Sequence, residues 1–340
     1  ELIMSTYRKI HGRSIQAVTT DPSESVTEGQ IWYNTTSDTF KTVLLNEAWS
    51  SGSSMTTARR DPAGFGAQNA AVGAAGYGGS GYTNVTEEYN GSGWAAGTAY
   101  PGAVASMGST GSQTAGLVFG ASGPGTPNSA TYEYDGSSWT AGSSLGTGRY
   151  DAAGAGIQTA ALAYGGSITT NVESYNGSSW TATTALNTAR RATASVGIQT
   201  AALAAGGKFT PNPTSITSNV EEWDGSSWTE VNNLPAPTFL MGSAGIQTDA
   251  LVFGGSQGAP VLSTTSGYDG TNWSAKPSMA TARDRIGSGQ YVSPSSAAIA
   301  FAGNDPNKKL TEEFTASASV ITAAAFSSGG VMPEATSSVA

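Results

Sequence analysis

The chain contains no cysteine and a single histidine among its 340 residues. A disulfide framework and a thiolate metal site are therefore excluded, and a multi-histidine metal centre cannot be built. Charged residues make up only 11% of the chain, against roughly 25% in an average soluble domain. The residues that dominate surface helices, Glu, Lys, Arg and Leu, are scarce, so a bundle of helices is disfavoured.

Long apolar runs and positive charge are also lacking. No run of about 18 apolar residues occurs, so neither a transmembrane helix nor membrane insertion is expected. The chain has 15 Lys+Arg against 24 Asp+Glu, a formal net charge of -9. Nucleic-acid binding depends on clustered Lys and Arg that contact phosphates, so the acidic balance argues against a nucleic-acid partner.

Glycine and aromatic residues are abundant instead, with 45 Gly, 14 Pro, 8 Trp and 13 Tyr. This aromatic content is not that of a solvated, disordered chain. Gly, Ser and Thr interspersed with regularly placed aromatics favour short strands joined by tight turns.

A segment of the form Tyr-Asn/Asp-Gly-Ser-x-Trp recurs along the chain. Successive Trp residues are 45, 45, 41, 48 and 45 positions apart: Trp49, Trp94, Trp139, Trp180, Trp228 and Trp273. A second motif, Gly-x-Gln-Thr and close variants, has intervals of 45, 45, 41 and 48: Gln68, Gln113, Gln158, Gln199 and Gln247. Two independent markers with the same irregular spacing establish a true repeat of about 45 residues.

Each repeat contains four expected strands. Strand a precedes Gly-x-Gln-Thr, strand b is an apolar run closing on glycines, strand c resembles Asn-Val-Glu-x-Tyr at 171–175, and strand d carries the Trp. The Asn/Asp-Gly between strands c and d predicts a hairpin with a type I′ turn, in which both central residues have positive φ. Four strands in about 45 residues are typical of a propeller blade, and we expect each Trp to fill the space between adjacent blades.

The Gly-Gly pair followed by a Tyr and then a Trp resembles the kelch repeat of β-propellers over roughly residues 50–330. The pair is intact at Gly78-Gly79, Gly165-Gly166, Gly206-Gly207 and Gly254-Gly255. The resemblance implies an all-β, kelch-like propeller. The segment from Glu28 to Trp49 is similar to segments of bacteriophage tail-fibre and other virion proteins.

The repeats predict six blades, with seven as the alternative. The a–b half occurs six times, whereas the c–d half occurs seven times if 40–50 and 310–326 both count. We divide the chain into an arm and linker at 1–29 and a propeller at 30–340, which includes an N-terminal hairpin (30–50) and a C-terminal closing segment (310–330). A strand from the N-terminal side would close the ring, because an open sheet edge is a pairing liability.

No set of catalytic residues stands out. A kelch-type copper oxidase of the galactose oxidase kind needs His ligands and a Tyr cross-linked to Cys, and this chain lacks them. A Ser-His-Asp triad could use only His11, which lies outside the repeats, and no carboxylate pair is singled out. We therefore expect a non-enzymatic protein with no catalytic or metal-binding residue and no cofactor; a propeller enzyme is the least favoured alternative.

An Arg recurs just after strand d, at Arg59, Arg149, Arg190 and Arg283. One interpretation is a ring of guanidinium groups at the channel mouth that binds an anion or sugar acid. The other is an Arg that hydrogen-bonds blade-edge carbonyls or a strand-c Glu such as Glu88 or Glu173. We favour the second, since two of six blades lack the Arg.

The b–c connections vary most between repeats, and all of them emerge on one face of a propeller. They supply candidate binding residues at Pro124, Pro127, Pro211, Pro213 and Gln257. Loops on a rigid scaffold are a usual place for recognition; tolerated drift in loop length explains the variation equally well.

The first 13 residues are basic, with Arg8, Lys9, His11 and Arg13 opposed only by Glu1, whereas residues 14–340 hold 12 Lys+Arg and 23 Asp+Glu. We interpret the N-terminal arm as a docking segment and the propeller as a scaffold that presents its loops to a partner. The main hypothesis is a structural or adhesion protein of a phage or phage-like virion. Its arm would contact other virion or surface proteins, and its loops a host-surface glycan or protein. The alternative is a cytoplasmic kelch-type protein-interaction module; homo-oligomerisation is left open.

Overall fold

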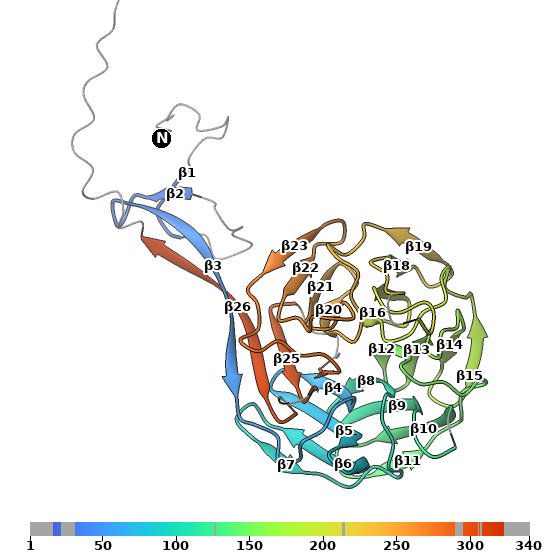
Figure 1. Ribbon diagram of the computed structural model, residues 1–340. Helices are drawn as coiled ribbons and strands as arrows, with labels where there is room; N and C mark the ends of the chain where they lie inside the picture. The colour runs from blue at the N-terminus through green and yellow to red at the C-terminus, as the bar shows by residue number, and fades with distance from the viewer. Residues whose placement is uncertain are drawn as a thin grey trace, which may run out of the picture. The chain divides into compact units, whose positions relative to one another are not determined.

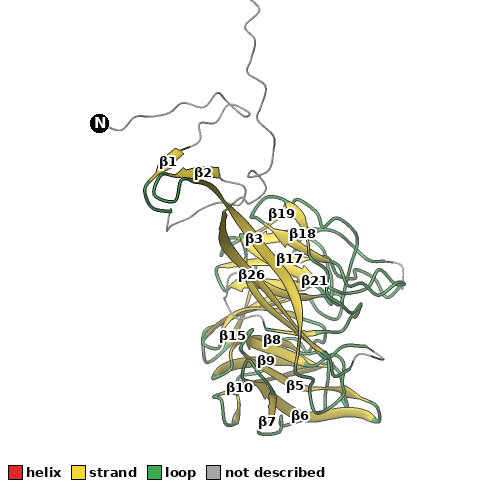
Figure 2. Ribbon diagram, turned by 90° about the vertical axis from the view of Figure 1, so that its left-hand side faces the viewer, coloured by secondary structure: helices red, strands yellow, loops and turns green. Residues whose placement is uncertain are grey.

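The computed structural model describes residues 16–21, 31–125, 127–212, 215–289, 295–304, 306 and 308–322. Strands, turns and loops account for all of these residues, and none of them lies in a helix (Figure 2). The strands form six sheets arranged around a common axis (Figure 1). The chain is therefore a six-bladed β-propeller, as the repeats predict. The described residues include no helix able to cross a membrane.

The residues divide into two compact units, one of residues 47–315 and one of residues 1–46 with 316–340. In the second unit, β1 (Gln16–Val18) pairs in parallel with β2 (Ile31–Asn34), and β2 forms a hairpin with the start of β3 (Thr39–Gly52). Hydrogen bonds from Lys41, Asn34 and Trp32 lower the pKa of Asp21 in this unit to about 2.

Five blades each consist of four antiparallel strands in the order a, b, c, d. Blade 1 contains β4 (Ala63–Ala67), β5 (Ala70–Gly78), β6 (Gly81–Tyr89) and β7 (Trp94–Ala96). Blade 2 contains β8 (Gly108–Ser112), β9 (Ala115–Ala121), β10 (Asn128–Tyr134) and β11 (Trp139–Ala141). Blade 3 contains β12 (Ala153–Ile157), β13 (Ala160–Tyr164), β14 (Val172–Tyr175) and β15 (Trp180–Thr183).

Blade 4 contains β16 (Ala194–Ile198), β17 (Ala201–Ala205), β18 (Val220–Trp223) and β19 (Trp228–Val231). Blade 5 contains β20 (Gly242–Ile246), β21 (Asp249–Phe253), β22 (Thr265–Tyr268) and β23 (Trp273–Lys276). The a strands surround the axis, and the short d strands lie at the rim (Figure 1).

The sixth blade is assembled from both ends of the chain. Its strands a to c are β24 (Gly287–Ser288), β25 (Ala297–Phe301) and β26 (Thr311–Thr322), and β3 pairs with β26 as strand d. A strand from the N-terminal side thus closes the ring. The seven-blade alternative fails because 40–50 and the segment after residue 310 supply strands d and c of the same blade.

Each Trp of strand d lies against the preceding blade. In blade 3, Trp180 packs edge-on against Phe119 with 5.1 Å between ring centroids, and its indole Nε1 donates to Thr131 Oγ1 at 3.0 Å. In the sixth blade, Trp49 packs on Phe253 at 4.9 Å and donates to Thr265 Oγ1 at 3.0 Å. The closing strand therefore repeats the packing of the regular blades.

Two hydrogen-bond patterns accompany the Trp at most blade interfaces. In blade 3, the Tyr175 hydroxyl donates to Glu133 of blade 2 at 2.7 Å, and Gln158 Nε2 donates to the carbonyls of Gly116 (3.1 Å) and Tyr134 (3.0 Å). The Gln of the Gly-x-Gln-Thr motif thus ties the a–b turn of one blade to strands b and c of its neighbour. This contact explains why the motif recurs with the same spacing as the Trp.

The c–d hairpins form as expected, but the turn is not type I′. In blade 2 the loop has four residues between the paired Tyr134 and Trp139. Asp135 Oδ1 accepts the backbone N–H groups of Ser137 (2.8 Å) and Ser138 (2.7 Å), and only Gly136 has a positive φ, of 90°. Because the Asp135 side chain caps the loop, the Asp135 backbone does not have to adopt the left-handed conformation.

Removal of β3 should open the ring. A variant lacking residues 1–52 loses strand d of the sixth blade together with Trp49, and we expect it to aggregate or to melt well below the full chain. A variant that starts at Gly29 keeps β3 and should retain the melting temperature. A monomeric 1–52 deletion with an unchanged melting temperature would contradict the closure.

Trp49→Ala should cost about 3–5 kcal/mol of unfolding free energy.

Candidate functional site

Six equivalent residues surround the propeller axis, one just before each strand a. All six have a left-handed backbone, with φ between 51° and 57°: Asp61, Ser106, Asp151, Ala192, Leu240 and Arg285. The N–H of each donates to the carbonyl of the equivalent residue one blade earlier, at 2.8–3.1 Å, and the Asp61 N–H donates to Arg285 O. The hydrogen bonds form a closed cycle, which we call the axial ring.

The axial ring has no sequence signature. Its members are two Asp, one Ser, one Ala, one Leu and one Arg. A left-handed backbone costs a residue with a side chain roughly 1–2 kcal/mol. Here the position is imposed by the blades on either side and by the cyclic hydrogen bonds, so side chains that do not favour this conformation are retained.

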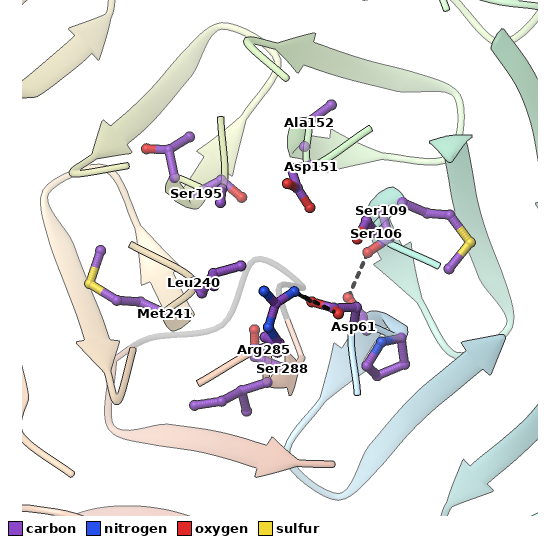
Figure 3. Close-up of a pocket in the computed structure, with 17 residues that line it drawn as sticks. Asp61, Ser106, Ser109, Asp151, Ala152, Ser195, Leu240, Met241, Arg285 and Ser288 are labelled. Atoms are coloured by element: carbon purple, nitrogen blue, oxygen red, sulfur yellow. Dashed lines mark hydrogen bonds and ion pairs between the residues drawn. The ribbon is translucent and has the colours of Figure 1, made fainter. Parts of the chain in front are cut away.

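The axial ring surrounds a cavity of about 90 Å³ (Figure 3). Below the ring the walls are small residues such as Gly64, Ser109 and Ser288, because adjacent a strands come very close. A Cβ on Gly64 would lie 2.6 Å from Ser288 N and O, which a side chain cannot tolerate. The cavity can hold a few water molecules, whereas typical small-molecule pockets measure roughly 300–1,000 Å³. Larger ligands would have to bind at its mouth.

Charged side chains gather at the mouth in two layers. Arg285 Nη1 lies 3.2 Å from Asp61 Oδ1 and 3.0 Å from Oδ2, and Arg191 Nη1 lies 3.1 Å from Asp151 Oδ2. The two carboxylates are the inner layer, with 8% and 12% of their side chains exposed, against 34% for Arg285 and 24% for Arg191. The cations therefore face the solvent and the acids lie beneath them.

Two further cations and three aromatic rings extend this surface. The Arg60 guanidinium lies 4.9 Å from the centre of the Tyr77 ring, and Arg191 lies 5.3 Å from that of Tyr150. Lys208 Nζ lies 5.6 Å from the centre of the Phe239 ring. We define the mouth cluster as six residues: Asp61, Asp151, Arg60, Arg191, Lys208 and Arg285.

The pKa shifts at the mouth reflect both burial and crowding of charge. Burial raises the pKa of Asp61 to about 6, against the opposing effect of Arg285, and burial also raises the pKa of Asp151. The pKa of Lys208 is lowered by burial and then by the positive charges of Arg191 and Arg285. Nearby cations thus act on Lys208 from two blades.

The four repeated Arg residues form a separate set, buried inside the blades. Each pairs with a strand-c Glu: Arg59 with Glu87 (3.0 Å), Arg149 with Glu173, Arg190 with Glu221, and Arg283 with Glu312 (3.0 Å). Their guanidinium groups also donate to backbone carbonyls, such as Asn171 O from Arg149 at 2.9 Å. The favoured interpretation is confirmed, and the guanidinium ring at the channel mouth is wrong.

One expected partner differs. Arg59 pairs with Glu87, whereas Glu88 accepts a hydrogen bond from the Tyr134 hydroxyl of the next blade. Adjacent residues of a strand point to opposite faces, so only one of the two carboxylates can face the Arg.

Blades 2 and 5 lack both members of the pair. In the two positions, blade 2 has Val104 and Tyr132, and blade 5 has Thr238 and Ser266. Arg and Glu are thus lost together, because either charge alone would be left buried without a partner.

The exposed loop residues lie in the b–c connections, as the order of strands requires. Pro124 and Pro127 lie between β9 and β10, Pro211 between β17 and β18, and Gln257 between β21 and β22. Lys208 of the mouth cluster belongs to one of these connections. Other predicted site residues lie outside the described residues: Pro213, and Arg8, Lys9, His11 and Arg13 of the arm.

All six signature Trp residues lie in strand d or its equivalent, at a blade interface: Trp49, Trp94, Trp139, Trp180, Trp228 and Trp273. The mouth cluster was not singled out from the sequence, because its residues come from four different blades and the residue types at these positions change from blade to blade.

No protein-family model matches the chain, and no curated protein is significantly similar to it. Within the described ranges, no group of three or more His, Cys, Asp or Glu side chains is placed to bind a metal ion.

The buried pairs offer an internal test. Arg190→Ala leaves Glu221 buried without a partner and should cost about 3–5 kcal/mol of unfolding free energy. The double change Arg190→Thr with Glu221→Ser copies blade 5 and should cost less than the single change. Denaturant unfolding of both variants measures the difference. A double variant no more stable than Arg190→Ala would show that the charge of Glu221 is not what makes the single change costly.

Asp61 should make stability depend on pH. Its folded pKa of about 6 exceeds its ordinary value of 3.8, so between these values the folded state binds more protons than the unfolded state. Stability contributed by Asp61 should therefore rise as the pH falls through about 6 towards about 4. Asp61→Asn removes this titration. The melting temperature of the variant minus that of the parent should decrease from about pH 7.5 to about pH 4.5; a difference that is constant or increases would contradict the shift.

Proposed function

We propose that this chain is a non-enzymatic, kelch-like propeller of a phage or phage-like particle, which binds an acidic glycan of a host surface at its mouth cluster. The layering of charge carries the proposal: half-buried guanidinium groups lie over more deeply buried carboxylates. Residues 47–315 contain 11 Lys and Arg. Four of these residues form the buried ion pairs, and four others belong to the mouth cluster: Arg60, Arg191, Lys208 and Arg285.

A carboxylated sugar fits this surface better than a neutral one. Guanidinium groups donate paired hydrogen bonds to carboxylates, and the neighbouring rings of Tyr77, Tyr150 and Phe239 offer apolar faces for sugar C–H groups. The chain is acidic overall, with a formal net charge of -9, so an anionic ligand is repelled by most of the molecule and attracted where cations are concentrated.

The arm supports a location on a particle. Arg8, Lys9 and Arg13 precede the propeller, and the ring is closed by β3, which begins at Thr39. The arm is therefore not needed for ring closure and is available to dock on an acidic surface of another virion protein. The similarity of the segment from Glu28 to Trp49 to virion proteins supports the same assignment.

Binding of polygalacturonate, an acidic polysaccharide, tests the proposal. We expect the full chain to bind polygalacturonate with an affinity that falls as the salt concentration is raised. It should not bind neutral dextran. The variant with Arg191→Gln and Lys208→Gln should bind at least about tenfold more weakly, since two charge-assisted contacts are lost. Affinity electrophoresis or calorimetry gives the comparison.

The matched control replaces Lys308 and Lys309 by Gln, which removes the same charge elsewhere and should leave binding unchanged. If both variants bind the polysaccharide equally weakly, the effect is one of net charge, and the mouth cluster is not the binding site. Preference for an acidic peptide over the polysaccharide would instead favour a cellular protein-interaction module.

A further inference from the structure

A second cavity, of about 290 Å³, opens in blade 5. Its apolar wall includes Leu234, Met241 and Val252, and Thr238 and Ser266 provide hydroxyl groups. Its volume is close to the lower end of small-molecule pockets, roughly 300 Å³, and about twice that of an engineered cavity of ~150 Å³ that binds benzene. The cavity is therefore large enough for a small organic group.

This cavity occupies the space that an Arg–Glu pair fills in other blades. Arg190 and Thr238 hold equivalent backbone positions: Arg190 N donates to Thr169 O and Thr238 N to Thr217 O, each in the preceding b–c connection. Ser266 takes the strand position of Glu221. Two short side chains thus replace two long ones, and the surrounding blade keeps its shape.

Loss of the pair does not by itself create a cavity. Blade 2 also lacks Arg and Glu, but there Val104, Tyr100 and Tyr132 fill the space, with 5.2 Å between the two Tyr ring centroids. Blade 5 has no such filling, so its cavity is a particular property of that blade.

Backbone carbonyls at the cavity are the ones that bind the guanidinium elsewhere. In blade 4, Arg190 Nη1 donates to Gly206 O at 3.3 Å and Asn219 O at 2.8 Å. The equivalent residues in blade 5, Gly254 and Thr264, both line the cavity. Thr264 O accepts only the Gly254 N–H (3.0 Å) from the described residues, and Gly254 O accepts none. A ligand with an N–H group would meet these acceptors.

The charges favour a neutral ligand over a cation. Ser266 lies where four of the other blades have the Glu that balances the guanidinium. Lys276 is the one charged residue of the cavity wall, and its Nζ is bound to Glu47 Oε1 at 2.6 Å. A guanidinium or ammonium ligand would be buried beside Lys276 without a carboxylate of its own.

We propose that this cavity binds the acetamido group of an N-acetylated sugar. The amide N–H donates to Gly254 O or Thr264 O, the amide oxygen accepts the Ser266 hydroxyl, and the methyl group packs against Leu234 and Val252. The Thr238 hydroxyl already donates to Ala236 O at 3.1 Å, so we assign the donor role to Ser266, which lies at the strand position of the missing Glu. The inference rests on the proposed glycan-binding role, but it concerns a cavity separate from the mouth cluster and adds a second sugar class to it.

Two methionine methyl resonances, compared with each other, distinguish binding in the two cavities. Met241 lines both cavities, whereas Met107 lines only the axial one. In a full chain labelled with ¹³C at the methionine methyls, N-acetylglucosamine should shift the Met241 signal and leave Met107 unchanged. Glucose and glucosamine, which lack the acetyl group, should shift neither. A glutamine peptide tests whether the amide comes from protein instead, and stronger binding by the peptide would overturn the proposal.

Two variants test the cavity. Thr238→Arg with Ser266→Glu rebuilds the pair of the other blades, so it should abolish the Met241 shift while the melting temperature is kept or raised. Ser266→Ala is milder and should weaken binding about three- to tenfold, as loss of one neutral hydrogen bond does. A Met241 signal that does not move up to roughly 50 mM sugar, where a site with a Kd of about 1 mM would be saturated, overturns the proposal.

The outcome is independent of the mouth cluster. The variant with Arg191→Gln and Lys208→Gln should keep the N-acetylglucosamine shift even where it loses polygalacturonate. If that variant binds neither ligand, the sugar binds at the mouth and the blade 5 site is wrong. If the parent chain does not bind polygalacturonate but still shows the N-acetylglucosamine shift, the proposed glycan role of the mouth is wrong and the blade 5 site is retained.

Discussion

The contact between one blade and the next is the interaction on which the whole propeller depends. In a single blade both faces of the sheet lack a partner, and the blade is stable only when its two neighbours cover them. The Trp of strand d and the Gln of the a–b turn provide that cover in successive blades. The circle is complete because Gln68 reaches Phe314 O of the sixth blade at 2.6 Å and Trp49 packs on the fifth.

Charge is used in two distinct ways within this frame. Inside four blades, Arg and Glu pair out of contact with solvent, so these charges serve the packing of the blade and are not available to ligands. At the mouth, Arg191 and Arg285 are more exposed than the carboxylates of Asp151 and Asp61, whose pKa values are raised by burial. Four of the 11 Lys and Arg residues of 47–315 thus lie at one end of the propeller axis, where the variable loops also lie.

The proposed binding cavity arises where one blade departs from the repeat. Blade 5 has Thr238 and Ser266 where blade 4 has Arg190 and Glu221, and a cavity opens at these positions. The rigid frame makes this exchange tolerable, because the backbone hydrogen bonds around the site stay the same in both blades. Binding properties can therefore differ from blade to blade while the fold is maintained.

The sequence by itself determined the repeat and the four strands of each blade, and it favoured six blades and a pairing role for the repeated Arg, because each of these depends on a residue type recurring at a regular interval. Tertiary structure alone decided the rest. Glu87 and not Glu88 meets Arg59 because of the facing of one strand, and Asp135 caps its turn instead of taking a positive φ. The axial ring unites residues as different as Leu240 and Arg285. Its conformation is imposed by neighbouring blades across the axis, and no local preference of those residues encodes it.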